Sequence, residues 1–103
     1  MKYIVEVLEN STRWKDFDTG KLHRLSEPAI EWRSGSKEYF VNGKRHNLNG
    51  PAVEEDGGHK EYWIDGVRYI KGQFDIKIES LNKKELTISQ IEEQLGYSIK
   101  IIK

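Results

Sequence analysis

Apolar and polar residues alternate over two short segments of the chain, KEYFV at 37–41 and KEYWI at 60–64. Such alternation is typical of a β-strand that presents one face to each side, and aromatic and β-branched residues favour strands. Each segment runs into an Asn-Gly or Asp-Gly dipeptide, which favours a type I′ hairpin turn because both turn positions need positive φ angles. The pattern predicts two hairpins, with turns at Asn42-Gly43 and Asp65-Gly66.

The two hairpins belong to a repeat with a period of 23 residues. Segments 20–42 and 43–65 are identical at 11 of 23 positions, which is the signature of a repeated structural unit. The identical pairs are Gly20/Gly43, Lys21/Lys44, His23/His46, Leu25/Leu48, Pro28/Pro51, Ala29/Ala52, Glu31/Glu54, Gly35/Gly58, Lys37/Lys60, Glu38/Glu61 and Tyr39/Tyr62.

The repeat extends beyond these two units in degenerate form. A third unit is expected over 66–72, and a partial unit is expected before Gly20. Phe17 lies 23 residues before Phe40, so it is expected to occupy the position of Phe40 and Trp63. Successive hairpins should continue as an antiparallel meander, which makes the fold class mainly β, a β-rich α+β protein with a twisted sheet.

Alternation divides the aromatic side chains of the repeat between two opposite faces of the sheet. The more aliphatic face is the better candidate for the core, and the other face is expected to present an aromatic row. The first face carries Tyr39, Val41, Tyr62 and Ile64, and the second carries Glu38, Phe40, Glu61 and Trp63.

The repeat stops at residue 73, and the remaining segment has different patterns. LTISQIEEQLGY predicts a helix over 88–95, with Thr87 as its N-cap and Gly96 as its stop residue. Ile91 and Leu95 would pack on the aliphatic face of the sheet. YSIKIIK then predicts a final strand, with which an N-terminal strand over 2–8 could pair.

Residues 73–80, QFDIKIES, fit two structures. Phe74, Ile76 and Ile78 alternate as in a strand, whereas Phe74, Ile78 and Leu81 would line one side of a helix. The strand is slightly favoured. In either case we expect one domain over 1–103, with the repeat at 13–72 and a cap at 73–103, because the ends of a repeat need covering.

Composition narrows the classes of function. Seventeen basic and seventeen acidic residues cancel, so direct nucleic-acid binding through a polybasic surface is not expected. Cysteine is absent, which excludes disulfides and cysteine metal sites. The start of the sequence alternates and contains Glu6, which is unlike a signal peptide, and no window resembles a membrane span. A cytoplasmic protein without membrane contact is therefore expected.

The recurring histidines and carboxylates are the candidates for chemistry. His23 and His46, with His59, could form a metal or proton-transfer site, but zinc needs about four converging ligands. A hydrogen bond from each recurring histidine to the turn is the favoured interpretation. Paired carboxylates could serve glycoside hydrolysis, although the repeat itself explains their recurrence. The recurring carboxylates are Glu31/Glu54 and Glu38/Glu61.

The aromatic strand, the NGKRH turn and the 23-residue period resemble MORN-type repeats, whose units are stacked β-hairpins. The form GKxHxxxGPA[VI]E is similar to a variant found in short proteins of tailed bacteriophages. The resemblance covers about residues 13–72, and the first unit departs from it where Ser26-Glu27 replaces Asn49-Gly50. It implies a scaffolding or binding module, and small phage proteins of this kind often block host defence.

The leading hypothesis is a non-enzymatic, phage-derived protein that binds and inhibits a host protein in the bacterial cytoplasm, for example a CRISPR-type or other defence complex. The chain shows no P-loop, dinucleotide fingerprint or nucleophile elbow, and no cofactor is expected. The alternatives are a structural repeat scaffold and a small-molecule- or nucleotide-sequestering protein that uses Lys44, Arg45 and His46. The protein could also form a homodimer. The expected partner-binding residues are Phe40, Trp63, Glu38, Glu61, Arg33 and Trp32.

Overall fold

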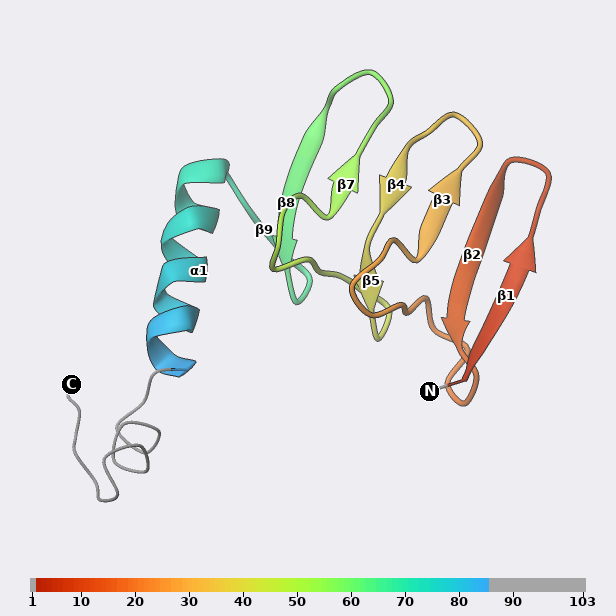
Figure 1. Cartoon of the computed structure of the whole chain (residues 1–103), viewed down its shortest axis with the longest axis horizontal. Coiled ribbons are helices and arrows are strands. Elements are labelled where there is room, and N and C mark those ends of the chain that lie inside the picture. The colour runs from red at the N-terminus through yellow and green to blue at the C-terminus, as the bar shows by residue number, and fades with distance from the viewer. Residues whose placement is uncertain (1, 86–103) are drawn as a thin grey trace. The chain divides into compact units, whose positions relative to one another are not determined.

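The structure is a computed structural model in which residues 2–85 are described. Contacts divide the chain into two compact units, Met1–Lys71 and Gly72–Lys103, and the first contains the repeats. The described part is mainly β, with strands followed by one helix (Figure 1). The predicted fold class, antiparallel hairpins with a C-terminal helix, is confirmed. That the whole chain forms a single domain stays a prediction.

Seven strands form the main sheet in the order β1-β2-β3-β4-β7-β8-β9, and every neighbouring pair is antiparallel. Strands β5 and β6 form a separate two-stranded hairpin. The expected meander is therefore present. The strands are β1 (Tyr3–Val7), β2 (Ser11–Asp16), β3 (Ile30–Trp32), β4 (Lys37–Glu38), β5 (Phe40–Val41), β6 (Lys44–Arg45), β7 (Val53–Glu54), β8 (Lys60–Ile64) and β9 (Val67–Tyr69).

The loops of Met1–Lys71 lie at the two ends of the strands (Figure 1). The loops that join β1 to β2, β3 to β4 and β7 to β8 lie side by side at one end, and the tight hairpin turns lie at the other end. Both Asn-Gly and Asp-Gly turns have the positive φ angles of the predicted type I′ turn, which confirms that prediction. The φ angles are 53° at Asn42, 81° at Gly43, 50° at Asp65 and 83° at Gly66.

The partial unit before Gly20 differs from the predicted alignment, and the position assigned to Phe17 is wrong. Lys15 forms a β-bridge with Leu22, and Phe40 pairs with Arg45 in β6. Because Leu22 and Arg45 hold the same position in the repeat, Lys15 rather than Phe17 is the equivalent of Phe40. The turn of the partial unit is longer. At its start, Oδ1 of Asp16 accepts hydrogen bonds from the backbone N–H groups of Asp18 and Thr19, which stabilise the extra residues. Phe17 is thereby shifted into the turn, where 55% of its surface is exposed.

The first full unit also differs from the second in the segment before its proline, as the sequence predicted. Ser26 has a φ of 68°, whereas the equivalent Asn49 does not have a positive φ. Replacement of Asn-Gly by Ser-Glu at this place thus changes the turn without changing the period of the repeat.

The core of Met1–Lys71 is a row of small and β-branched side chains where neighbouring repeats meet. Ala29 accepts a backbone hydrogen bond from Trp14 and donates one to Glu38, so it is bonded to strands on both sides. Ala52 occupies the same place in the next unit, and both alanines are 0% exposed. The other buried apolar residues of this unit include Ile30, Val53 and Ile64.

The segment over 73–80 is helical, so the favoured strand prediction is wrong. Helix α1 (Lys71–Glu85) covers it completely. Burial follows the helical spacing: Phe74 is buried and Ile78 and Leu81 are half-buried, while Ile76 is 71% exposed. Lys, Gln, Glu and Leu, which are good helix formers, make up eight of the fifteen residues of α1. Helical propensity therefore outweighs a short alternation.

Several expectations fall outside the described residues. They are the helix over 88–95, the final strand, the packing of Ile91 and Leu95, and the pairing of the N-terminal strand with the last one. The N-terminal strand itself is present as β1, where it pairs with β2.

Candidate functional site

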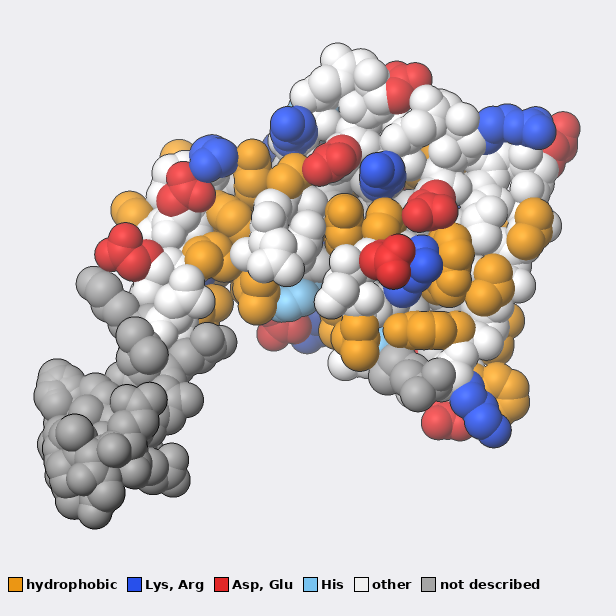
Figure 2. Space-filling view, in the orientation of Figure 1, with side chains coloured by type: hydrophobic (Ala, Val, Ile, Leu, Met, Phe, Trp, Pro, Cys, Tyr) orange, Lys and Arg blue, Asp and Glu red, His pale blue; other side chains and the backbone are white. Residues whose placement is uncertain are grey.

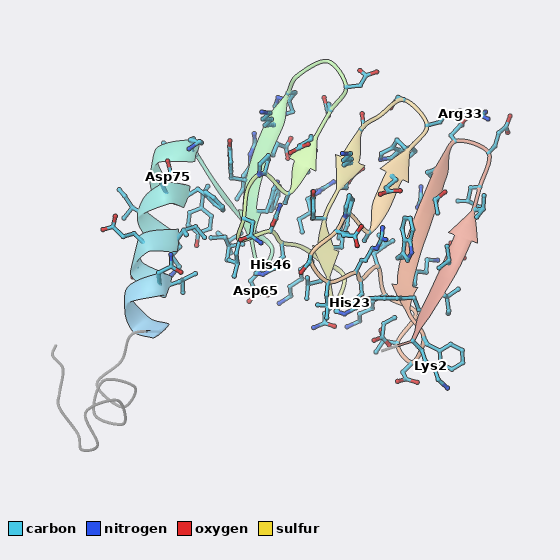
Figure 3. The ribbon with its side chains drawn as sticks, in the orientation of Figure 1. Lys2, His23, Arg33, His46, Asp65 and Asp75 are labelled. Carbon is cyan, nitrogen blue, oxygen red and sulfur yellow. The ribbon has the colours of Figure 1, made fainter. Side chains whose placement is uncertain are left out.

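The recurring histidines join neighbouring repeats. Nδ1 of His23 accepts a hydrogen bond of 2.9 Å from the backbone N–H of Asn42, in the turn of the next unit. Nδ1 of His46 accepts the equivalent bond of 2.8 Å from Asp65. Figure 3 shows both histidines toward the same end of the strands, with His46 beside Asp65. The predicted histidine–turn hydrogen bond is confirmed, and it links each unit to the next one.

The Gly-Lys pair of the repeat serves the same junction. The side chain of Lys21 lies against Gly43, where an added Cβ would be 3.4 Å from its Cδ, and Lys44 lies in the same way against Gly66. Each of these glycines also has a φ angle that L side chains rarely adopt. The GKxH motif is therefore explained by stacking: glycine forms the turn, and lysine and histidine hold the turn that follows.

The three basic residues proposed for nucleotide binding, Lys44, Arg45 and His46, are each engaged in contacts within the chain. Lys44 packs on the following glycine and has its ammonium group 4.0 Å from Asp65. Arg45 is paired with Glu38, and His46 uses Nδ1 at the turn. Within residues 2–85, no group of three or more His, Asp or Glu is arranged to hold a metal ion.

The strand register assigns side chains to faces because directly opposed residues of antiparallel strands share a face. Ile30 is opposite Glu38, which is opposite Val53, and Val53 is opposite Glu61. The register thus agrees with the predicted grouping of Glu38 and Glu61. We call this surface the tryptophan–arginine face; it comprises Arg13, Ile30, Trp32, Glu38, Phe40, Arg45, Val53, Glu61 and Trp63, of which Ile30 and Val53 are buried core residues. The prediction that the core lies on the opposite, more aliphatic face is therefore only partly right, since Ile64 is buried there.

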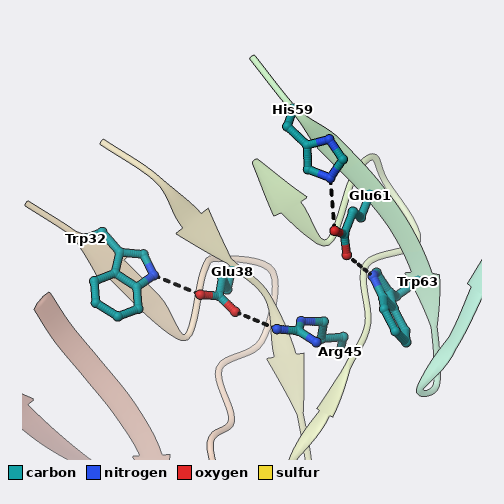
Figure 4. A network of polar contacts seen from close by, with 6 residues as sticks. All are labelled: Trp32, Glu38, Arg45, His59, Glu61 and Trp63. Atoms are coloured by element: carbon teal, nitrogen blue, oxygen red, sulfur yellow. Dashed lines mark hydrogen bonds and ion pairs between the residues drawn. The ribbon is translucent and has the colours of Figure 1, made fainter. Parts of the chain in front are cut away.

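Glu38 is held at both carboxylate oxygens by its neighbours on this face (Figure 4). The indole N–H of Trp32 donates to Oε2 at 2.8 Å, and Nη2 of Arg45 donates to Oε1 at 3.1 Å. The side chain of Glu38 is 17% exposed and that of Arg45 is 39% exposed, so the ion pair is only partly shielded from water. The carboxylate orients one aromatic and one basic side chain at the same time.

Glu61, the repeat equivalent of Glu38, is held in a similar way by different residues. Nε2 of His59 lies 2.9 Å from Oε2, and the indole N–H of Trp63 donates to Oε1 at 2.9 Å. The hydrogen bond with His59, followed by that with Trp63, lowers the pKa of the Glu61 carboxyl. The two recurring carboxylates therefore have the same function in the repeat: each fixes an indole ring.

The lowered pKa of Glu61 predicts a pH effect. A carboxyl group with a depressed folded-state pKa stabilises the fold at pH values above its unfolded-state pKa. This stability is lost as the pH falls through the folded-state pKa. We expect the pKa of Glu61 to rise more in His59→Ala than in Trp63→Phe, because His59 makes the larger contribution. An NMR titration of the Glu61 carboxyl carbon measures it. An ordinary glutamate pKa in the wild-type chain would contradict the described contacts.

Two arginines complete the tryptophan–arginine face by stacking on its rings. The guanidinium carbon of Arg45 lies 5.5 Å from the centre of the Phe40 ring and 5.3 Å from that of Trp63. Arg13 lies 5.4 Å from the ring of Trp32. These distances are within the range of cation–π attraction. Arg45 thus joins the aromatic side chains of two neighbouring repeats.

The structure brings five of the six predicted site residues together and separates the sixth. Arg33 is exposed in the loop after β3, where its backbone N–H donates to the C=O of Asn10. It lies at the other end of the strands from His23 and His46 (Figure 3). Arg13 was not predicted from sequence, and Arg45 was predicted only for the nucleotide-binding alternative. Arg45 could have been found, because a two-residue turn places it directly opposite Phe40.

A hollow of about 450 Å³ lies beside the ring of Trp32, between two repeats. It is open to solvent and combines an indole ring and an aliphatic side chain with hydroxyl and carboxylate groups. Its volume lies within the range of about 300–1,000 Å³ that is typical of ligand pockets. The lining residues are Trp32, Ser34, Ser36, Glu38, Val53, Glu55, Asp56 and Gly57.

The opposite face of the sheet carries its own arginine–tryptophan contact. Trp14 follows Arg13 in β2 and therefore points to the other side. The guanidinium of Arg24 lies 3.8 Å from the centre of the Trp14 ring. Burial, and then the charge of Glu54, raises the pKa of the Tyr39 hydroxyl on this face. In the space-filling view, hydrophobic side chains lie among acidic and basic ones over the strands (Figure 2).

The chain matches no protein-family model, no curated protein and no solved structure. Among the described residues no helix is long and apolar enough to cross a membrane. The resemblance to MORN-type repeats and to the phage variant stays a prediction.

Proposed function

We propose that the chain is a non-enzymatic protein-binding module that docks through its tryptophan–arginine face. The observation that supports this is the arrangement of three aromatic rings and two arginines on one face of a repeat sheet, held by two carboxylates. Tryptophan and arginine are the residue types most enriched among the energetically important residues of protein interfaces.

The polar contacts within the face favour binding for an energetic reason. A partner that immobilises a long side chain loses about 0.5–1.5 kcal/mol of rotamer freedom for each one. Here Glu38 already orients Trp32 and Arg45, and Glu61 already orients Trp63. Both indole N–H groups are satisfied, so a partner does not leave them unpaired when it covers the rings. The face is therefore largely ordered before binding.

The class of partner is proposed from the sequence. The GKxHxxxGPA[VI]E unit resembles repeats of short phage proteins, which supports a bacterial host protein as the partner and its inhibition as the outcome. A defence complex, for example of the CRISPR type, fits this proposal. The site of action is then the cytoplasm of the host cell. We expect no cofactor in this role, because binding alone suffices to block a partner.

A capture experiment tests the proposal. The full chain is used to capture proteins from a bacterial lysate, in parallel with Trp63→Ala and with Trp14→Ala, which changes the same residue type on the opposite face. We expect a stoichiometric partner with the wild type and with Trp14→Ala, and loss of it with Trp63→Ala. A melting temperature raised by nucleotides, with no protein partner captured, would overturn the proposal.

A further inference from the structure

Strand β1 forms one edge of the seven-stranded sheet, and among the described residues it pairs only with β2. The hydrogen bonds at its two ends show which backbone groups face β2. The N–H of Phe17 donates to the C=O of Lys2, and the N–H of Leu8 donates to Ser11. Hydrogen-bonded positions alternate along an antiparallel strand, so the even-numbered residues of β1 are bonded to β2. The backbone N–H and C=O groups of Tyr3, Val5 and Val7 therefore point outward.

This edge lacks the usual protection against pairing. Natural edge strands are protected by lysine or proline, by a bulge, or by very short length. The five residues of β1 pair with β2 without a bulge, and they include neither lysine nor proline. Val5 is 50% exposed and Val7 is 78% exposed. The one charged residue, Glu6, is paired with Lys15 at 3.0 Å in the neighbouring strand.

The opposite edge of the sheet is less suited to pairing. Strand β9 has three residues, against five in β1, and it contains Arg68. A partner strand would gain fewer main-chain hydrogen bonds there, and an arginine within the strand disfavours a second strand of the same kind. The two edges therefore provide an internal comparison.

We infer that β1 is a dimerisation strand, which pairs in antiparallel fashion with β1 of a second copy of this chain. The two-fold axis passes by Val5, so that Val5 faces the same residue of the other copy and Tyr3 faces Val7. In this register the outward backbone groups of Tyr3, Val5 and Val7 all find partners. The dimer joins two seven-stranded sheets into one continuous sheet.

The side chains of β1 favour a second copy, in this orientation, as the occupant. The strand is self-complementary: tyrosine meets valine on one face, and aromatic with β-branched pairs stabilise a sheet. On the other face Glu6 meets Ile4 rather than another carboxylate. A parallel arrangement of two copies would place Glu6 next to its own equivalent and bring like charges together. A symmetric contact of this kind closes after two copies.

Sedimentation of the full chain over a range of concentrations tests the inference with two matched variants. Val5→Lys places two like charges opposite each other at the axis and should raise the dimer dissociation constant at least tenfold. Val67→Lys is the control, because Val67 lies in the other edge strand and is 54% exposed, close to the exposure of Val5. It should leave dimerisation unchanged. A wild-type chain that is monomeric at every concentration would overturn the inference, as would dissociation by Val67→Lys alone.

A cross-linking experiment tests the register. The chain has no cysteine, so single cysteines can be introduced without interference. Opposed residues of a hydrogen-bonded antiparallel pair have Cα atoms about 5.5 Å apart, within the range of about 4.4–6.8 Å that a disulfide requires. Val5→Cys should form a disulfide-linked dimer on oxidation, and Val7→Cys should do so much more slowly. Faster cross-linking of Val7→Cys would contradict the proposed axis.

Amide exchange identifies the occupant of the edge. At dilution, where the chain is monomeric, we expect fast exchange at Val5 and Val7, and protection only at concentrations that favour the dimer. Protection at both concentrations would show that another segment of the same chain covers β1, which would overturn the second copy as occupant. Circular dichroism of each variant checks that the sheet is retained.

Discussion

The double variant Phe40→Ala/Trp63→Ala is expected to weaken the partner complex at least about a hundredfold, the effect of losing one or two strong interface residues. Phe40 and Trp63 are the two rings on which Arg45 stacks, so their removal also leaves Arg45 held by Glu38 without its contacts to the rings. A partner would then lose the aromatic surface and the cation–π contacts of Arg45. Titration of the captured partner with each variant measures the change in affinity.

Trp14→Ala is the matched control for this prediction. It removes an indole ring that also contacts an arginine, but on the opposite face of the sheet. We expect the affinity to change by less than about threefold, within the usual range for residues outside the binding centre. Circular dichroism of the double variant checks the fold, because the buried Ile30 and Val53 lie on the same face as Phe40 and Trp63. Unfolding of the double variant, or equal loss of affinity in Trp14→Ala, would show that the faces are assigned the wrong way round.

His23→Ala is expected to lower the free energy of unfolding by about 2 kcal/mol, the combined effect of a lost hydrogen bond and a small cavity. His23 is 3% exposed, and its Nδ1 is the acceptor for the turn N–H of Asn42. His46 makes the same bond at a more exposed site, so His46→Ala should cost about 1 kcal/mol or less. Chemical denaturation of both variants measures the difference.

An asparagine at the same position separates the hydrogen bond from the packing. The side-chain oxygen of asparagine can reproduce an acceptor close to the place of Nδ1, whereas that of glutamine lies one bond further out. His23→Asn should therefore be more stable than both His23→Gln and His23→Ala. Equal stability of all three would mean that the ring contributes by packing alone. Addition of zinc or of a chelator should leave the melting temperature of the wild type unchanged.

The repeat and its turns could be predicted from sequence because they depend on local chemistry. Asn-Gly and Asp-Gly specify positive φ angles, and recurrence of His23 at His46 pointed to a contact that recurs with the turn. The assignment of Glu38 with Phe40 to one face followed from strand alternation. These features need only neighbouring residues and a constant period.

The errors arise where longer-range information was needed. The position of Phe17 was wrong because the alignment assumed a constant period through a turn that is longer than the others. Segment 73–80 shows a short alternation that a strand and a helix can share, and its burial decides for a helix. Arg33 directly follows Trp32 in sequence but lies in the loop after β3, away from the ring. Cross-strand pairing, rather than proximity along the chain, decides which arginine reaches a ring.

The central claim is that the partner binds the tryptophan–arginine face, and the three tryptophans provide a direct test. Trp32 and Trp63 lie on that face, and Trp14 lies on the other. Hydroxyl-radical footprinting with mass spectrometry, applied to the wild-type chain alone and in its complex, compares the oxidation of all three in one sample. We predict that the partner protects Trp32 and Trp63 and leaves Trp14 unchanged. Protection of Trp14, with Trp32 and Trp63 oxidised as in the free chain, would contradict the claim.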